Sequence, residues 1–174
     1  FRRVLFRSDL IVHLAAVVSG QAEADFDLGM RINVDATRSL LDVARALGTC
    51  PRVVFASSVA VYGGELPSCV TDTTALRPQN SYGAQKAIAE LMLADYTRKG
   101  YVDGRILRLP TISVRPGKPN QAASGFASGI IREPLSGISA ICPVSLDTRI
   151  WLASPRTAIS AFAHACRLDG TVLG

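Results

Sequence analysis

The sequence predicts an α/β fold, a Rossmann-like doubly wound parallel sheet with helices on its faces. Short apolar runs rich in β-branched residues alternate with longer segments whose apolar residues recur three and four positions apart. This alternation is typical of βαβ units, whose crossover helices cover a parallel sheet. Polar residues follow the predicted strands, and such sheets bind ligands at the carboxyl ends of their strands.

The first strand is predicted at residues 10–14, a continuous apolar run of the kind found in strands covered on both faces. Helical periodicity follows over residues 25–47, and Gly48 is placed as a C-terminal stop. One apolar stripe of this helix contains Leu40, Ala44 and Leu47. Together these segments form the first strand and helix of the alternation.

Residues 52–56 are predicted as the second strand, and a loop rich in Gly, Pro, Ser and Thr follows over residues 63–79. Asn80 or Ser81 can cap the next helix, which we expect to end near Lys99. We expect its buried stripe to contain Ala87, Leu91 and Ala94 or Asp95.

A third strand is predicted at residues 104–109 and a polar loop at residues 113–124. A short helix near residues 125–132 follows. Ser154 before Pro155 marks the start of a last helix, which ends near Arg167, because Ser caps helices and Pro is tolerated at the first helical position.

Composition and charge exclude several classes of protein. With 174 residues, 48% of them hydrophobic, the chain has the size of one globular domain. The net charge is +5, but Arg2, Arg3 and Arg7 carry three of these charges, so we expect no nucleic-acid partner. The longest apolar stretch, residues 10–18, is far shorter than the ~20 residues of a membrane span, so we expect no membrane segment.

The four cysteines lie at least 19 positions apart and the chain has two histidines, so no spacing of metal ligands occurs and we expect no bound metal. They are Cys50, Cys69, Cys142 and Cys166. Free thiols indicate a reducing, cytoplasmic location. Residues 1–8 form an atypical segment, either foreign sequence or the edge of a truncated reading frame, and residues 9–174 form the domain.

Residues suited to proton transfer follow the second strand and begin the next helix. Tyr82 and Lys86 are four positions apart, hence on one face of a helix, and Ser57 and Ser58 end the strand before it. For tyrosine to act as a base near pH 7, its pKa of about 10 must fall by roughly 3 units, about 4 kcal/mol. A neighbouring ammonium supplies part of this, and a serine hydroxyl can hold the reacting oxygen.

Structural alternatives exist for each of these residues. Tyr82 and Lys86 can form an exposed helix pair, and the serines can hydrogen-bond at the strand end. For His13 the favoured interpretation is a packed, hydrogen-bonded strand residue rather than a base, and His164, in an Ala-rich helix, is also expected to be structural.

The run VFASSVAVYG at 54–63, followed by YGAQK at 82–86, resembles the extended short-chain dehydrogenase/reductase superfamily, the NAD-dependent epimerases and dehydratases. The turn that begins at His13, and Asn33, fit the same pattern. Segments 15–20, 108–112 and 115–126 resemble, more narrowly, a sugar-acid-oxidising branch. The resemblance covers nearly everything from residue 9 onward.

The resemblance implies NAD as cofactor and a catalytic set of Ser58, Tyr82 and Lys86. Ser58 is preferred to Ser57 because it stands four positions before Tyr62. The implied cofactor-binding residues are Leu14, Ala15, Ala16, Val18, Asn33, Ser57, Tyr82, Lys86, Pro110 and Ile112. The implied substrate-binding residues are Ser19, Ser58, Arg115 and Asn120. The alternatives are a solvent-facing Asn33 and a solvated Arg115.

The chain departs from the superfamily in one respect, because it contains no glycine-rich phosphate-binding turn. We therefore expect an internal fragment that lacks the first βαβ unit and binds NAD poorly by itself. The expected reaction of the intact parent is hydride transfer to NAD from the C2 hydroxyl of a short sugar acid such as D-erythronate. The alternatives are a nucleotide-sugar epimerase or dehydratase, and a catalytically silent fragment.

The resemblance also implies a homodimer of the full-length protein. Many relatives dimerise through a four-helix bundle made by the helices that match residues 25–47 and 80–99, and the apolar residues of these helices spread wider than one buried stripe needs.

Overall fold

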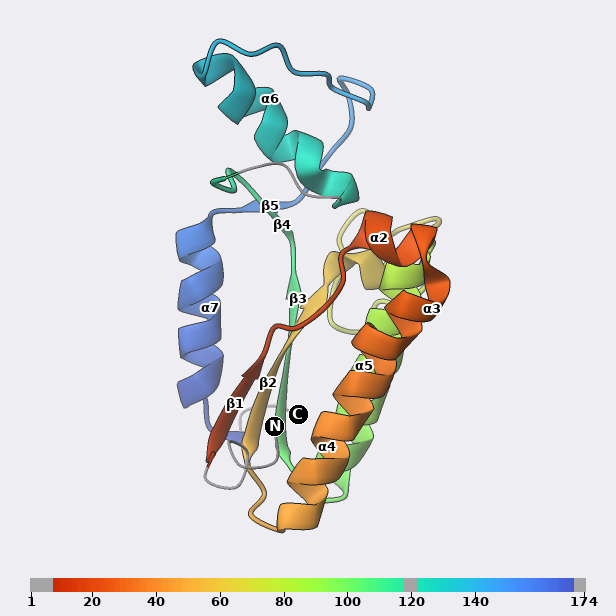
Figure 1. The fold of residues 1–174 in the computed structure, drawn as a ribbon, viewed down its shortest axis with the longest axis vertical. Coiled ribbons are helices and arrows are strands. Elements are labelled where there is room, and N and C mark those ends of the chain that lie inside the picture. The colour runs from red at the N-terminus through yellow and green to blue at the C-terminus, as the bar shows by residue number, and fades with distance from the viewer. Residues whose placement is uncertain (1–7, 118–121, 171–174) are drawn as a thin grey trace.

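The computed structural model describes residues 8–117 and 122–170, and its centre is a three-stranded parallel sheet (Figure 1). The strands, in spatial order, are β1 (Leu10–His13), β2 (Arg52–Ser58) and β3 (Asp103–Leu109). The pairing of Leu10 with Arg52 and of Arg52 with Asp103 sets the register. The prediction of a parallel α/β sheet is therefore confirmed. β2 is the central strand, and it continues to Ser58, beyond the predicted end at residue 56.

Helices cover both faces of this sheet (Figure 1). One face carries α4 (Ala36–Leu47) and α5 (Ser81–Arg98), and α7 (Pro155–Arg167) lies on the other. The side chain of Asn80 caps α5, and that of Ser154 caps α7, as the sequence predicts. Among the described residues, none of the helices has both the length and the apolar character needed to cross a membrane.

A smaller substructure lies beyond the carboxyl end of β3 (Figure 1). Two parallel two-residue strands, β4 (Thr111–Ile112) and β5 (Leu152–Ala153), form a second sheet. The 3-10 turn η3 (Ala123–Gly125) leads into α6 (Phe126–Leu135), which is longer than the predicted helix at 125–132. The sequence did not predict β4 and β5, because two residues are too few to show any periodicity.

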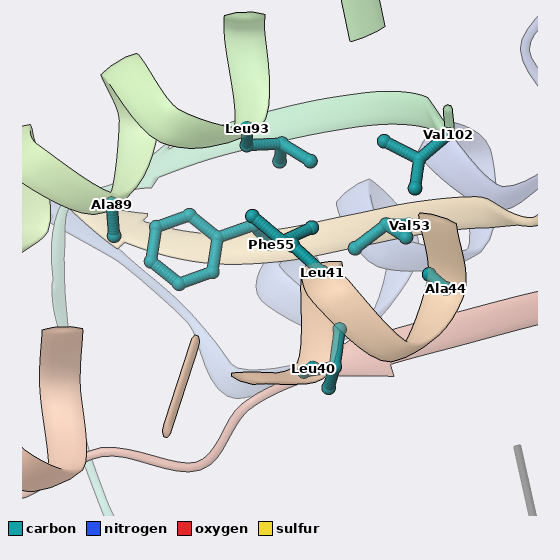
Figure 2. Close-up of a cluster of buried hydrophobic side chains, with 8 residues drawn as sticks. All are labelled: Leu40, Leu41, Ala44, Val53, Phe55, Ala89, Leu93 and Val102. Atoms are coloured by element: carbon teal, nitrogen blue, oxygen red, sulfur yellow. The ribbon is translucent and has the colours of Figure 1, made fainter. Parts of the chain in front are cut away.

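The main hydrophobic core lies between β2, α4 and α5 (Figure 2). Its residues are Leu40, Leu41, Ala44, Val53, Phe55, Ala89, Leu93 and Val102. Each large apolar side chain buried here contributes roughly 1.5–3 kcal/mol to stability. Leu40 and Ala44 belong to the predicted stripe of α4 and are buried, whereas Leu47, the third member, is partly exposed.

The predicted stripe of α5 is wrong except for Ala87, which is buried. Leu91 is 67% exposed, and Ala94 and Asp95 are exposed as well. The buried face of α5 carries polar side chains, among them Lys86 and Glu90, next to its apolar core residues. Hydropathy alone therefore selected the wrong face, because it counts buried polar residues as solvent-facing.

The predicted helix at 25–47 is divided in the structure. It is preceded by α2 (Ser19–Ala24), whose sequence lacks apolar periodicity, and begins as α3 (Phe26–Gly29). The Asp25 side chain caps α3 by accepting a hydrogen bond from Leu28 N at 2.9 Å. A π-helical segment, η1 (Met30–Asp35), then joins α3 to α4. Each turn of a π-helix holds an additional residue, and here it carries the buried residues Asn33 and Val34.

The expectation that β1 is covered on both faces is also wrong for the described residues. Leu10 is 43% and Val12 is 41% exposed, whereas His13 is buried. β1 forms an edge of the described sheet, and Leu10 and Val12, two positions apart, lie on the same face of this strand, so that face is the one left uncovered.

Two arginines near the amino ends of β2 and β3 hold α7 in place. Arg52 donates to the Cys166 carbonyl at 2.7 Å, and Arg105 donates to the Leu168 carbonyl at 3.1 Å. Asp103 pairs with both guanidinium groups. Burial opposes ionisation of Asp103, but these hydrogen bonds hold its pKa below the usual range. Cations at a helix C-terminus satisfy its last carbonyls, so this cluster fixes α7 against the sheet.

Candidate active site

The carboxyl ends of the three main strands open into a cleft of about 400 Å³. The turn after β1, the end of β2, the start of α5 and the segment after β3 line it. Of the residues implied by the resemblance, the cleft is lined by Leu14, Ala16, Val18, Ser19, Ser57, Ser58, Tyr82, Lys86, Pro110, Ile112 and Arg115. Ala15 and Asn33 are not among its lining residues, and Asn120 lies outside the described residues.

The first turn of α5 brings Tyr82 beside the end of β2. The Asn80 side chain accepts a hydrogen bond from Gly83 N at 2.8 Å and so starts the helix. A Cβ at Gly83 would lie 2.1 Å from the Ala60 carbonyl oxygen, so only glycine permits this approach. Ala60 belongs to the 3-10 turn η2 (Val59–Val61), which follows Ser58 directly. The close packing places Tyr82 within hydrogen-bonding reach of Ser58.

Lys86 is held in the wall of the cleft with 2% of its surface exposed. Its Nζ donates to the Ala56 carbonyl at 2.8 Å and lies 5.6 Å from the centre of the Tyr82 ring. Burial lowers the pKa of Lys86 to about 8, against the opposing effect of the Glu90 carboxylate. The ammonium is therefore buried, oriented and close to the phenol.

Tyr82 keeps its proton at neutral pH in this state. Burial raises the pKa of its hydroxyl, and a hydrogen bond with Ser58 opposes that rise. The nearby ammonium thus does not by itself lower the pKa of Tyr82 as the sequence argument expected, because desolvation penalises the phenolate more. A further positive charge beside the phenol is needed to make it a base near pH 7.

A buried carboxylate that sequence reasoning missed lies behind the cleft. Glu90 is 3% exposed and accepts hydrogen bonds from the Ser57 hydroxyl and from Arg108, whose Nη2 is 2.7 Å away. Arg108 also donates to the Tyr62 hydroxyl at 2.6 Å. The only signal in the sequence is that Glu90 follows Lys86 by four positions, on the same helix face.

Asn33 does not face solvent, so that alternative is wrong. The side chain is 1% exposed and its amide binds both backbone groups of Val17: Oδ1 accepts from Val17 N at 2.9 Å and Nδ2 donates to Val17 O at 3.2 Å. Nδ2 also donates to Oε1 of Gln85 at 2.7 Å. Asn33 therefore holds the turn that lines the cleft rather than lining it. Gln85 was missed, since a glutamine inside a helix carries no recognisable pattern.

His13 is a packed core residue, as predicted. It is buried, its Nε2 lies 2.9 Å from the Thr37 hydroxyl, and its ring lies 5.5 Å from that of Phe55. Burial and the charge of Lys86 both lower the pKa of His13. His13 is therefore neutral near pH 7. His164 is exposed on α7.

Arg115 lines the cleft from the segment that follows β4. Its backbone is fixed to α6, because Arg115 N donates to the Ser128 hydroxyl at 3.0 Å and its carbonyl accepts from Arg132 at 2.7 Å. Within the described ranges, the buried Nη2 of Arg115 has no hydrogen-bond partner. Ser19 accepts a hydrogen bond from Ala123 N at 2.9 Å, which joins α2 to η3. A guanidinium with an unused donor in a cleft suits an anionic ligand.

The side chains that could ligate a metal ion are dispersed in the described part of the chain. Across residues 8–117 and 122–170, no three His, Cys, Asp or Glu side chains gather in a way that would hold a metal ion.

The chain is similar to named dehydrogenases. It is 68% identical over 164 residues to D-erythronate dehydrogenase from Cupriavidus necator, covering 94% of this chain and 51% of that protein. It is 54% identical over 166 residues to D-erythronate dehydrogenase from Haemophilus influenzae, covering 95% and 53%. The chain thus spans about half the length of the curated relatives it matches.

A solved structure and a family model agree with this similarity. The crystal structure of the nucleoside-diphosphate-sugar epimerase from Agrobacterium tumefaciens superposes with a TM-score of 0.92 at 52% identity, covering 99% of this chain and 52% of that one. The model of the NAD dependent epimerase/dehydratase family matches residues 2–151. The expected superfamily is confirmed, and this chain belongs to the NAD dependent epimerase/dehydratase family.

Proposed function

We propose that the full-length protein is an NAD-dependent oxidoreductase that oxidises the C2 hydroxyl of a short sugar acid such as D-erythronate. One observation carries the proposal: Ser58, Tyr82 and Lys86 converge on one cleft at the carboxyl ends of a parallel sheet. The similarity to two D-erythronate dehydrogenases supports the substrate class.

Residues 9–174 would form part of an NAD-binding domain together with part of the substrate region. The donor set of the cleft fits the nicotinamide ribose, because Lys86 Nζ has three N–H donors and binds one acceptor, the Ala56 carbonyl, among the described residues. The residues that would hold the cofactor line the cleft: Leu14, Ala16, Val18, Ser57, Tyr82, Lys86, Pro110 and Ile112. Asn33 would act indirectly, by holding the turn that contains Ala15 and Val17. When bound, NAD supplies the acceptor for the electron pair from C2 and a positive charge near Tyr82.

The chain's own residues would perform the proton transfer and the binding of substrate. Tyr82 Oη takes the proton of the C2 hydroxyl, and Ser58 orients the oxygen that loses it. Lys86 stabilises the phenolate by its positive charge. Arg115 binds the substrate carboxylate with two parallel N–H donors, and Ser19 lies in the same cleft. Asn120, which lies outside the described residues, remains a candidate from the resemblance alone.

Replacing Tyr82 by Phe tests this assignment in the full-length protein. We expect NADH formation with D-erythronate to fall by roughly 10²-fold or more, because the variant keeps the ring but loses the proton acceptor. Binding of NADH, measured by fluorescence titration, should be largely retained. Turnover at the wild-type rate would refute the role of Tyr82.

An epimerase is the second candidate, favoured by the 52% identity to the solved epimerase from A. tumefaciens. The two reactions differ in their net product. Incubating the full-length protein with D-erythronate and NAD should produce NADH in proportion to substrate consumed. Conversion of a nucleotide sugar without net NADH would favour the epimerase.

We further propose a homodimer and a cytoplasmic location for the full-length protein. α4 and α5 lie side by side on one face of the sheet (Figure 1), and Leu91 and Ile88 of α5 are 67% and 38% exposed. Exposed apolar residues on α5, with α4 packed beside it, suit a four-helix interface. Cys50, Cys69 and Cys142 are exposed free thiols, which suits a reducing compartment.

A further inference from the structure

Gln85 is buried on α5 between Tyr82 and Lys86 in a way that stability alone does not explain. Its side chain is 1% exposed, and its Oε1 accepts one hydrogen bond, from Asn33 Nδ2 at 2.7 Å. Its Nε2 is buried without a hydrogen-bond partner in the described part of the chain. An unpaired buried amide group costs more free energy than one hydrogen bond typically contributes. An apolar residue of the same size would be at least as stable.

The hydrogen bond that Gln85 accepts ties the Asn33 amide to α5. Asn33 uses its oxygen for Val17 N and one N–H for Val17 O, and Gln85 accepts the other N–H. In the flipped amide, the N–H donors would face Val17 N–H, and the oxygen would face the oxygens of Val17 and Gln85. Val17 therefore fixes which way the Asn33 amide is turned, and Gln85 anchors the amide in that orientation to α5.

Two further observations show that α5 packs closely against α3 and α2. A Cβ at Gly29 would lie 2.4 Å from Gln85 Nε2, so α3 leaves room for this side chain. Glu23 of α2 accepts a hydrogen bond from Ser81 N, the first residue of α5, at 2.8 Å. The start of α5 is therefore tied both to the turn after β1 and to the helix that follows that turn.

We infer that Gln85 is a positioning residue that acts through Asn33 and Val17 to hold the turn at residues 14–18 in register with Tyr82 and Lys86. This turn supplies the apolar wall of the cleft through Leu14, Ala16 and Val18. The inference rests on the proposed NAD cleft. Because the turn and the catalytic pair line the same cleft, a shift between them would weaken the binding of a cofactor held there.

The test compares Gln85→Met with wild type in the full-length protein. Methionine keeps the length but removes the strong acceptor. We expect the Kd for NADH, from fluorescence titration, to rise about 3- to 10-fold, the equivalent of one hydrogen bond. Hydrogen exchange of the Val17 amide should become faster, while amides of β2 stay protected.

A double-mutant cycle separates positioning from a general loss of stability. In an Asn33→Ala background, Gln85→Met should leave the Kd for NADH unchanged, because its target is already gone. Gln79, an exposed glutamine bonded to the Arg77 and Pro78 carbonyls, gives the matched control Gln79→Met, with no expected effect.

Several outcomes would overturn the inference. Additive effects of the two substitutions, or a lower Tm for Gln85→Met with an unchanged Kd, would show a purely structural role. If wild type binds NADH and Gln85→Met binds it equally well, this inference fails while the proposed function stands. If wild type binds no NADH, both fail.

Discussion

At the scale of single residues, the site contains two groups whose protonation is set by burial. Lys86 is buried with a pKa of about 8, and burial raises the pKa of Tyr82. A lysine that loses its proton more easily and a tyrosine that holds its proton more firmly are both consequences of low polarity. An added positive charge, as on the oxidised cofactor, would therefore lower the pKa of the Tyr82 hydroxyl and favour loss of its proton.

We predict that Lys86 titrates near pH 8 in the cofactor-free, full-length protein. NMR of the lysine Nζ groups can follow it. Because the folded pKa lies below the ordinary 10.5, the unfolded state binds more protons between these values, and stability rises with pH from about 8 to 10.5. Lys86→Met should remove this rise. A Lys86 midpoint near 10.5 would contradict the prediction.

At the scale of elements, one carboxylate joins the helix that carries the site to two strands. Glu90 of α5 binds Ser57 of β2 and Arg108 of β3, and Arg108 continues to Tyr62 after η2. Hydrogen bonds to Glu90 and Tyr62 raise the pKa of Arg108, with burial acting against them. The position of Lys86, one turn before Glu90, is thus fixed relative to both strand ends.

We predict that Glu90→Gln lowers the free energy of unfolding by about 3 kcal/mol, since removing one partner of a buried ion pair leaves the other charge uncompensated. The matched control is Asp95→Asn on the same helix, where the Arg98–Asp95 pair is exposed. That change should cost less than about 0.5 kcal/mol. Urea unfolding measures both. An equal decrease in the free energy of unfolding in both variants would show that the buried ion pair contributes no more to stability than the exposed one.

At the scale of the whole molecule, exposed apolar surface lies on both sides of the sheet. Leu91 on α5 and Ile159 on α7 are exposed to a similar degree, 67% and 69%. They lie on opposite faces, because α5 and α7 cover different sides of the sheet (Figure 1). The proposed dimer uses the α5 side, so these two residues make a matched pair for testing it.

We predict that the full-length protein is a homodimer that Leu91→Glu converts to a monomer, because a charge buried in an apolar interface loses its hydration. Ile159→Glu should leave the dimer intact. Sedimentation velocity over a range of concentrations distinguishes these states. A wild-type monomer at all concentrations, or loss of the dimer in Ile159→Glu, would contradict the proposed interface.

The elements that the sequence predicted well are those whose causes are local. β2 is a short apolar run, and the caps Asn80 and Ser154 mark the starts of α5 and α7. Tyr82 and Lys86 are neighbours on one helix face because they are four positions apart, whatever surrounds the helix. The buried face of α5 could not be predicted in this way, because Lys86 and Glu90 are buried through partners on other elements.

The sequence by itself determined the parallel α/β class and the spacing that puts Tyr82 and Lys86 on one helix face after a strand that ends in serines. The resemblance to a known family implied that Ser58, Tyr82 and Lys86 act as one set. Only the tertiary structure decided what holds that set in place. Asn33 meets Gln85 across 52 positions, and Arg108 meets Glu90 across 18. Such pairs leave no local pattern, because each side chain is buried only when its distant partner satisfies its hydrogen bonds.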